Sequence, residues 1–476
     1  MKHRGSILPM VLVITALAAM VAASLLYRMH AEVRASGAGA QGEQAYLAAM
    51  SGIQHAVAIL KAAPRDAAVW YDNPELFANQ LVYDDGVNRW YFAIYAPNLS
   101  DAESVRYGLI DEAGKINLNT ADEEMLAKLP GMTPERVDCL LDYRDGDEET
   151  RPDGAEQDYY GTLPYPYVIR NGLLETLEEL LLVKGFDAEA VYGEDYNLNG
   201  LLDRNEDDGR DTFPPDDGDG RLNRGLLAMA TVASYEFAVD NDGKPRININ
   251  GGDEDLAALD GIGLAQQTVD FIRQFRKEGN QFKHPSELLG MRYQSKAAGE
   301  QRQGGRPGRG EEVPGGGWIE SGVGPAQLPV VMDRLTVTPS RKSESGAVMT
   351  IVTPGLVNVN TAAAAVLAAI PRIEPELARQ IADARWQVDA EKKATIAWLR
   401  TENLVDDATF KEIAPRLTAR SYQFRIRCVG FGVPCGRFYV AEAILDTASG
   451  APRVVYLRDL TRLGLPMALN VEQQER

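Results

Sequence analysis

The feature that most constrains this chain is an uncharged apolar segment beside its N-terminus. It runs from Ser6 to Leu26 and follows the basic stretch Lys2-His-Arg4 and then Gly5. As a helix rising ~1.5 Å per residue, the segment reaches ~30 Å, about one bilayer core. The basic residues ahead of it hold that end in the cytoplasm, so the rest of the chain lies outside. We therefore expect a single-pass inner-membrane protein with a periplasmic head.

Three interpretations of this segment compete. A cleaved secretory signal has a shorter apolar core and a small-x-small cleavage site. A plain transmembrane anchor fits the length. A prepilin leader, residues 1–5, is cut between Gly5 and Ser6 and leaves the apolar helix on the mature chain. The basic stretch and Gly5 directly abut the apolar run, which favours the leader.

Helical spacing of apolar residues continues past the membrane segment, at Tyr46, Leu47, Met50, Ile53, Ala56, Val57 and Leu60. We predict one helix over residues 6–60, half in lipid and half packed on a head. Three glycines lie between the two halves and can loosen or bend the helix: Gly37, Gly39 and Gly42.

Segments rich in aromatic and β-branched residues predict strands on both sides of a long middle region. The first half of the sheet is expected over residues 61–112, in the stretches VWYDNPE, NRWYFAIYA and SVRYGLID. The second half is expected over residues 419–476, in YQFRIRCVGF, RFYVAEAILD and RVVYLRDL. The predicted fold is α+β: a long N-terminal helix packs on an antiparallel sheet, as in pilins, and a large α-helical domain is inserted between the strands.

The middle region contains an internal repeat. Each copy begins with the pattern hydrophobic-Asn-hydrophobic-Asn and continues as a helix, a tight turn and a second helix. The pattern occurs in Lys115–Ala121, Arg246–Asn250 and Val357–Ala362. We expect the second Asn, or the Thr after it, to cap the incoming helix, and Gly to supply the tight turn. These are modules of the helix-hairpin-helix or SAM-like kind.

The modules suggest domain boundaries. The first module, with the acidic loops described below, spans residues 113–232, and the second spans 233–293. Linker strands and the third module span 327–418. Residues 294–326 are rich in Gly, Gln and Arg and almost lack apolar side chains, so we predict a disordered loop there.

The sharpest candidate site is the twelve-residue segment from Asp195 to Glu206, which matches an EF-hand loop. Its oxygen-bearing positions one, three, five, seven, nine and twelve are Asp195, Asn197, Asn199, the Leu201 carbonyl, Asp203 and Glu206, with Gly200 at position six. Calcium takes six to eight hard oxygens, which this set supplies. Pro214 and Pro215 follow closely, so a second EF-hand helix is absent or short. We predict a calcium staple and not a sensor; the competing interpretation is an acidic surface turn.

A second acidic cluster follows this loop. Asp217, Asp219 and Asn223 echo positions three, five and nine of the same pattern, but Pro215 falls at position one. A second calcium ion there is a further hypothesis. Without a cation these carboxylates would repel one another.

Composition and motifs argue against several other classes. The net charge of −20 opposes a surface that grips nucleic-acid phosphates, so we expect no nucleic-acid partner. None of the four histidines lies beside a nucleophile motif, and we predict no enzymatic activity. Cys139 lies on an apolar helix face and is expected to be buried. Cys428 and Cys435 can be bridged or free.

Several motifs together resemble one family, the GspK-type minor pseudopilins of type II secretion. They are the Arg4-Gly5 junction, the Lys115–Ala121 module, Tyr143-Arg-Asp-Gly-Asp147, Arg151-Pro-Asp-Gly-Ala-Glu156, Asp158-Tyr-Tyr160, and Asn171-Gly172 leading into Glu175–Val183. The resemblance implies cleavage and N-methylation by a prepilin peptidase, with Ser6 first in the mature chain. It also implies calcium within the head, assembly with other minor pseudopilins and the major pseudopilin, and a role in initiating or capping the pseudopilus during protein export across the outer membrane.

One residue gives the tip position a physical reason. The resemblance implies that major subunits carry Glu at the fifth mature position, where it neutralises the free amine of a neighbouring subunit within lipid. Here that position is Met10. A subunit without this carboxylate suits the top of the fibre. Two alternatives stay open: a type IV pilus minor pilin, and a membrane-tethered DNA receptor that uses its helix-hairpin-helix modules.

Overall fold

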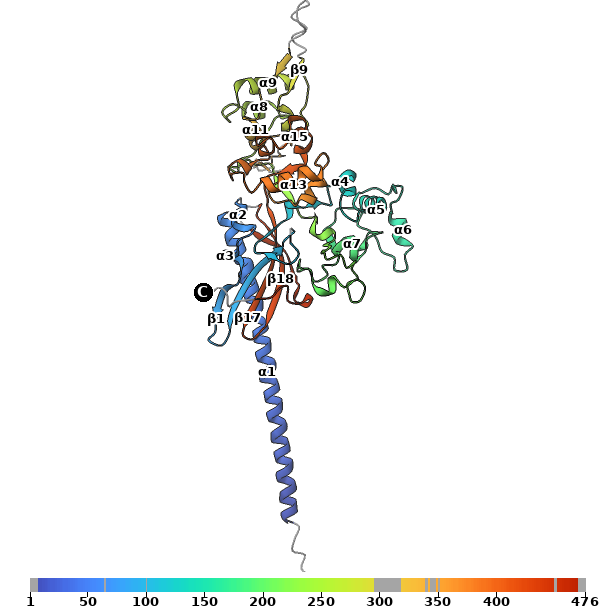
Figure 1. Cartoon of the computed structure of the whole chain (residues 1–476), viewed down its shortest axis with the longest axis vertical. Helices are drawn as coiled ribbons and strands as arrows, with labels where there is room; N and C mark the ends of the chain where they lie inside the picture. The colour runs from blue at the N-terminus through green and yellow to red at the C-terminus, as the bar shows by residue number, and fades with distance from the viewer. Residues whose placement is uncertain are drawn as a thin grey trace, which may run out of the picture.

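The computed structural model describes residues 7–63, 66–99, 101–294, 318–338, 341–342, 348–349, 352–448 and 452–469. Gly5 and Ser6, the predicted processing site, lie outside the described residues. In Figure 1 a single long helix stands free at one end of the molecule, a sheet lies at its middle, and helical modules lie at the other end and to one side.

The N-terminal helix is continuous. Helix α1 spans Ile7–Ala62, 56 residues, and is long and apolar enough to cross a membrane. Its side chains are exposed from Leu8 through Val33, and its buried face begins at Ala45. Gly37, Gly39 and Gly42 all lie within the helix and interrupt nothing. The prediction of one long helix through these glycines is therefore confirmed, because each glycine keeps a helical backbone.

The two predicted halves of the sheet form one antiparallel sheet, in the order β1 (Gln80–Asp84), β2 (Arg89–Pro97), β17 (Gln423–Val433), β18 (Phe438–Asp446) and β19 (Arg453–Asp459). Two short strands, β3 (Val105–Arg106) and β4 (Ile110–Asp111), pair with β2 and β17. Ile94 lies opposite Cys428, so strands far apart in sequence are neighbours. The predicted α+β class, a long helix on an antiparallel sheet, is confirmed.

One predicted strand, VWYDNPE, is wrong. This stretch forms two short helices, α2 (Ala67–Trp70) and α3 (Pro74–Phe77). The side chains of Asp66 and Asn73 accept hydrogen bonds from the first turns of these helices. Caps of this kind favour helix starts over strand pairing. Each helix places one aromatic side chain, Trp70 or Phe77, in the core beneath α1.

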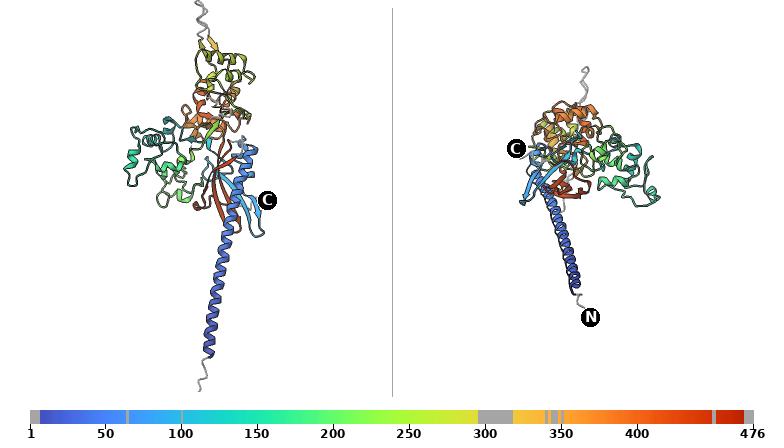
Figure 2. Two further views of the ribbon diagram at one scale, coloured as in Figure 1. Left: turned by 180° about the vertical axis from the view of Figure 1, so that it is seen from behind. Right: turned by 60° about the horizontal axis from the view of Figure 1, so that its bottom comes forward.

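The three central strands β2, β17 and β18 are buried on both faces, whereas the edge strands β1 and β19 are largely exposed. Phe92 and Ile94 of β2 pack under α1 with Cys428, while Tyr91 and Tyr95 pack against the first helical module. Figure 2 shows α1 along one side of the sheet and the first module on the other.

Two glycines bring α1 close to the sheet. A Cβ at Gly430 would lie 2.2 Å from the Ala45 carbonyl oxygen, and one at Gly52 would lie 2.4 Å from the Cys428 Sγ atom. Cys428 therefore faces the helix, whereas Cys435 lies past the end of β17, in the turn before β18. Both thiols are free, and so is that of the buried Cys139.

Each repeat folds as a helix–turn–helix unit closed by a short parallel ladder. The opening strands are β5 (Ile116–Asn117), β8 (Ile247–Asn248) and β15 (Val357–Asn358). They pair with β6 (Ala230–Thr231), β11 (Leu335–Thr336) and β16 (Leu417–Thr418). The helix pairs are α4 (Glu123–Ala127) and α5 (Pro134–Arg144), α8 (Asp253–Ala257) and α9 (Gln266–Lys277), and α12 (Ala364–Ala368) and α13 (Pro375–Ala384).

The second Asn of each repeat does not cap a helix, which corrects the prediction. The Asn119 side chain bonds both ways with the backbone of Leu174, and Asn250 does the same with Phe282. Asn360 donates to the carbonyls of Lys393 and Ala419. The helices begin three or four residues after these Asn residues. The amide therefore holds a later segment of the chain against the module.

Further elements complete the head. They are α6 (Gln157–Gly161), the 3-10 helix Leu177–Leu182, α7 (Ala188–Tyr192), α11 (Leu328–Arg334), α14 (Trp398–Thr401) and α15 (Asp407–Ile413). The first and third modules share one apolar core, which joins Leu126 and Leu140 to Val366 and Ile381. The second module has its own core around Phe271.

The predicted disordered loop, 294–326, is wrong at its C-terminal part. Strand β10 (Trp318–Glu320) pairs with β9 (Arg292–Gln294), and Val323 is buried in the core of the second module. The apolar residues of this stretch supply enough buried surface to order it. Residues 295–317 lie outside the described part of the chain.

Candidate metal centres

The predicted EF-hand-like loop follows α7 and lies against the end of the sheet. Asp195, Asn199 and Glu206 are buried. Asn197, Leu201 and Asp203 are half-buried. Gly200 has φ +76°, and a Cβ at this position would lie 2.8 Å from the Pro97 side chain at the end of β2. Both the turn and the close approach therefore require glycine at position six.

The structure brings the predicted ligand side chains together. The Nδ2 groups of Asn197 and Asn199 donate to Asp203 Oδ2 at 2.7 and 2.9 Å. The Gly200 amide donates to both carboxylate oxygens of Asp195 at 3.2 and 3.1 Å. The Asp203 amide donates to Glu206 Oε2 at 3.1 Å. The two neutral side-chain amides thus direct their N–H groups at the Asp203 carboxylate.

The electrostatics of the loop also favour a cation. Burial raises the pKa of Asp195 above its ordinary value. Burial raises the pKa of Glu206 to about 7, and the nearby carboxylates of Asp195 and Asp203 add to the effect. A bound divalent ion would stabilise the ionised forms and lower both pKa values. The donor set consists of hard oxygens, which calcium prefers.

The loop also ties the first module to the sheet. Arg427 of β17 donates to the Leu198 carbonyl at 2.7 Å. Arg224 donates to the carbonyls of Gly200 at 2.8 Å and Asn98 at 3.1 Å. Order in this loop therefore affects how the module lies on the sheet.

The second predicted set is arranged differently. Asp217 and Asp219 are exposed, and each accepts a hydrogen bond from a backbone amide two residues later. The backbone N–H of Asn223 instead donates to Glu194 Oε2 at 2.9 Å. Among the described residues, no hydrogen bond joins Asn223 to the two aspartates.

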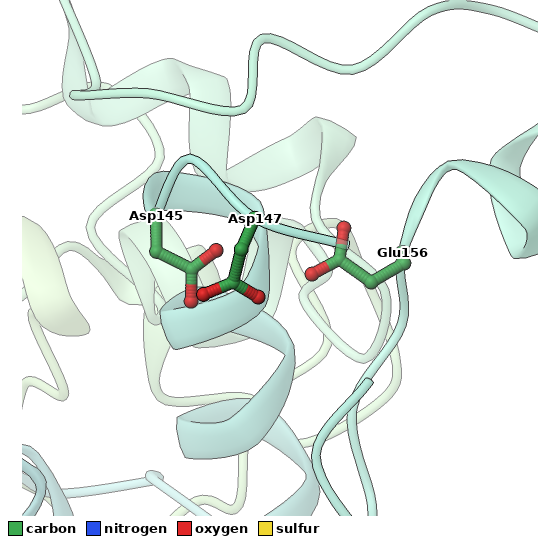
Figure 3. A group of neighbouring side chains, drawn as sticks. All are labelled: Asp145, Asp147 and Glu156. Carbon is green, nitrogen blue, oxygen red and sulfur yellow. The ribbon is translucent and has the colours of Figure 1, made fainter. Parts of the chain in front are cut away.

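A different acidic cluster lies between α5 and α6 (Figure 3), and our sequence analysis did not single it out as a metal site. Asp145 ends α5, Asp147 lies in the turn that follows, and Glu156 precedes α6. One carboxylate oxygen from each residue lies within 4.8 Å of the other two. Figure 3 shows the Glu156 carboxylate directed toward the two aspartates.

Glu156 gives this cluster its chemical interest. The residue is only 4% exposed, and within the described part of the chain neither of its carboxylate oxygens has a hydrogen-bond partner. Burial raises its pKa to about 7, and Asp142, Asp145 and Asp147 add to the effect. A buried carboxylate without a partner is costly unless it is protonated or meets a cation. The cluster is therefore a second candidate metal centre.

A sequence signal for this cluster did exist. Asp145 and Asp147 lie in one of the motifs that carried the family resemblance, and Glu156 lies in another. Their spacing in the sequence matches no known metal-binding loop pattern. The intervening Arg151–Gly154 turn sets the distance between the two motifs. Only the folded chain places the three carboxylates together.

Comparison with known proteins connects this region to one family. Residues 125–192 match the family model described as Type II secretion system (T2SS), protein K. This match includes Asp145, Asp147 and Glu156. Among solved structures, the GspK-GspI-GspJ complex of the enterotoxigenic Escherichia coli Type 2 Secretion System contains a chain that aligns at 12% identity and a TM-score of 0.37. The alignment covers 89% of this chain and 98% of that one. Among curated proteins, none matches at a significant level.

Proposed function

We propose that this chain, whose residues 125–192 match the type II secretion system protein K model, is the minor pseudopilin at the tip of the secretion pseudopilus. There it initiates or caps assembly for protein export across the outer membrane. The observation that carries this proposal is the free part of α1, an exposed apolar rod that continues into a helix packed on a sheet.

The apolar rod supports lateral assembly in the membrane. Its exposed side chains include Leu12, Ile14, Leu17, Val21 and Leu25. Such a surface is stable in lipid or against the rods of sister subunits. We propose that prepilin peptidase cuts between Gly5 and Ser6, and that the mature helix then packs beside those of other minor pseudopilins and the major pseudopilin in the inner membrane.

Two features support the tip position. Met10 offers no carboxylate to the amine of a subunit above it. The second and third helical modules lie beyond the end of α1 that is farthest from the free rod (Figure 1), so they would obstruct a further subunit at that end. A type IV pilus minor pilin would share the rod, but the protein K match favours type II secretion.

Labelling of assembled fibres tests this proposal. Gold-conjugated antibody against the full chain should mark one end of each pseudopilus, and the mature protein should begin at Ser6 by mass spectrometry. Label distributed along the fibre would contradict the tip position. A mature N-terminus beyond Leu26 would contradict the assembly proposal as a whole.

We also propose that the head binds calcium, at the Asp195–Glu206 loop and at the Asp145, Asp147 and Glu156 cluster. Ions there would neutralise buried carboxylates and hold the first module on the sheet. No catalytic step is proposed for either site.

The loop makes a direct prediction. Asp195→Ala combined with Glu206→Ala should lower the melting temperature in calcium and shrink the difference between calcium and chelator. An ion at a hundredfold excess over its Kd adds ~2.7 kcal/mol, which for a protein of this size is roughly 3 °C. Adding Glu156→Gln should remove the rest of the calcium response. Glu374→Ala with Glu376→Ala, two exposed carboxylates of the third module, is the control, and an unchanged calcium response in the loop variant would exclude calcium at the loop.

A further inference from the structure

A cavity of about 230 Å³ opens beside α7, on the solvent side of the first module. None of the proposed metal ligands lines this cavity. One wall, at Tyr196, comes from the Asp195–Glu206 loop. The residues that matter in its lining are Asp187, Glu189, Tyr196, Phe213, Pro214 and Pro215.

The walls of this cavity are aromatic and apolar. The ring centroids of Tyr196 and Phe213 lie 4.6 Å apart with an interplanar angle of 75°. Phe213 is 63% exposed, so core packing does not explain it. Asn205 donates to the Phe213 carbonyl at 3.1 Å, and two prolines follow directly, so the backbone beside the ring is restrained.

The rim of the cavity is acidic. Asp187 Oδ1 already accepts the Ala190 amide at 2.8 Å and lies 3.7 Å from Arg136. Glu189 is exposed at the rim and is the carboxylate that can meet a ligand.

The surrounding module adds to the negative charge at the rim. Residues 113–232 contain 28 Asp and Glu against 11 Lys and Arg, so most of the net charge of −20 lies in this quarter of the chain. Such a surface attracts cationic partners and repels anionic ones.

We propose that this cavity binds an arginine or lysine side chain of a partner protein. Its apolar walls suit the methylene stem of such a side chain. The faces of Tyr196 and Phe213 attract a cation, and Glu189 pairs with its charge. A purely apolar side chain would contact the walls but would not pair with Glu189. The experiment below distinguishes a cationic from an apolar ligand. The site goes beyond the proposed assembly role, because it lies on the head and not on the rod.

Fluorine NMR of the full chain in neutral detergent tests the proposal. A single 4-fluorophenylalanine at position 213 reports on the cavity. The probes are the acetylated, amidated pentapeptide Ala-Leu-Arg-Leu-Ala and the same peptide with citrulline, which has the shape of arginine without its charge. The arginine peptide should shift the signal saturably and bind ~10-fold more tightly than the citrulline peptide.

Matched variants complete the design. Glu189→Gln should weaken binding of the arginine peptide and leave binding of the citrulline peptide unchanged. Asp158→Asn, which alters an exposed carboxylate of the same module, should change the affinity for neither peptide. A 4-fluorophenylalanine at position 165, where Tyr165 is 89% exposed, should not respond. Equal affinity for the two peptides, or parallel shifts at positions 213 and 165, would overturn the proposal. Neither result depends on the pseudopilus role.

Discussion

At the scale of the residue, buried carboxylates fall into two kinds in this protein. Glu112 and Glu442 are buried, and burial alone would raise their pKa values. Arg425 and Lys115 lower the pKa of Glu112 to about 2, and Arg425 and Arg427 lower that of Glu442 to about 2. Glu156 and Glu206 are equally inaccessible yet have pKa values of about 7. The difference is the presence of a cation. Where the chain supplies none, a metal ion can.

The Glu156 carboxylate makes a pH-dependent prediction. Its folded pKa of about 7 lies above its ordinary value of 4.5, so the folded state holds the proton more tightly than the unfolded state. In chelator, its contribution to stability is complete below pH 4.5 and is lost as the pH rises through 7. Glu156→Gln should therefore melt at a higher temperature than wild type at pH 8 in chelator and should lose part of the calcium response. The two proteins should differ least at pH 4.

Melting curves at both pH values, with calcium and with chelator, check this prediction. Glu148→Gln removes an exposed carboxylate from the same loop and is the control. If wild type and Glu156→Gln lost stability in parallel between pH 4 and pH 8 in chelator, the buried carboxylate would not be the cause.

At the scale of the element, the main contact is that of α1 with the sheet. Small residues make it possible, because Ala45 and Ala49 of the helix lie against Gly430 of β17. Backbone atoms approach closely there, and side chains such as Ile53 and Leu60 fill the remaining space. The first half of the same helix exposes apolar side chains, whereas one face of its second half is buried in the protein core.

Glycine substitutions test this packing. Gly430→Ala places a Cβ 2.2 Å from the Ala45 carbonyl oxygen, a backbone atom that cannot rotate away, and should destabilise the protein by ~2–3 kcal/mol. Gly37→Ala, in the exposed part of the same helix with no neighbour within 4 Å, should be neutral or stabilising by ~0.5–1 kcal/mol. Denaturant unfolding of the full chain in detergent measures both. Equal effects would show that α1 does not pack on the sheet as described.

At the scale of the whole molecule, charge is distributed unevenly. The first module carries most of the negative charge, and the helix–turn–helix units that could suggest DNA binding lie in and beside it. In the second unit, Arg273 pairs with Asp260, and Arg276 donates to the carbonyls of Asn250 and Asn280. These basic groups serve the fold, which weakens the DNA-receptor alternative.

A gel-shift assay addresses that alternative. The full chain in detergent should not shift duplex DNA at micromolar protein in physiological salt, because phosphate binding requires a basic surface. A salt series extends the measurement. A shift that weakens steeply with added salt would support the DNA receptor and contradict the pseudopilin proposal.

Local patterns in the sequence predicted much of this protein. The uncharged run predicted α1, the alternating aromatic stretches predicted β2, β17, β18 and β19, and the spaced Asn residues identified three repeats. Each signal depends on residues close together in the chain. The same approach failed for residues 69–75, where aromatic content suggested a strand and two side-chain caps made helices.

The sequence by itself determined which segments are apolar, which repeat, and where oxygen-bearing side chains are spaced for a cation, because these properties are set by neighbouring residues. Only the tertiary structure decided that β2 pairs with β17, that Asn119 binds Leu174 in place of capping a helix, and that Glu156 joins Asp145 and Asp147. The physical reason is that these contacts join residues separated by turns or by most of the chain, so their distances depend on the path of the whole backbone.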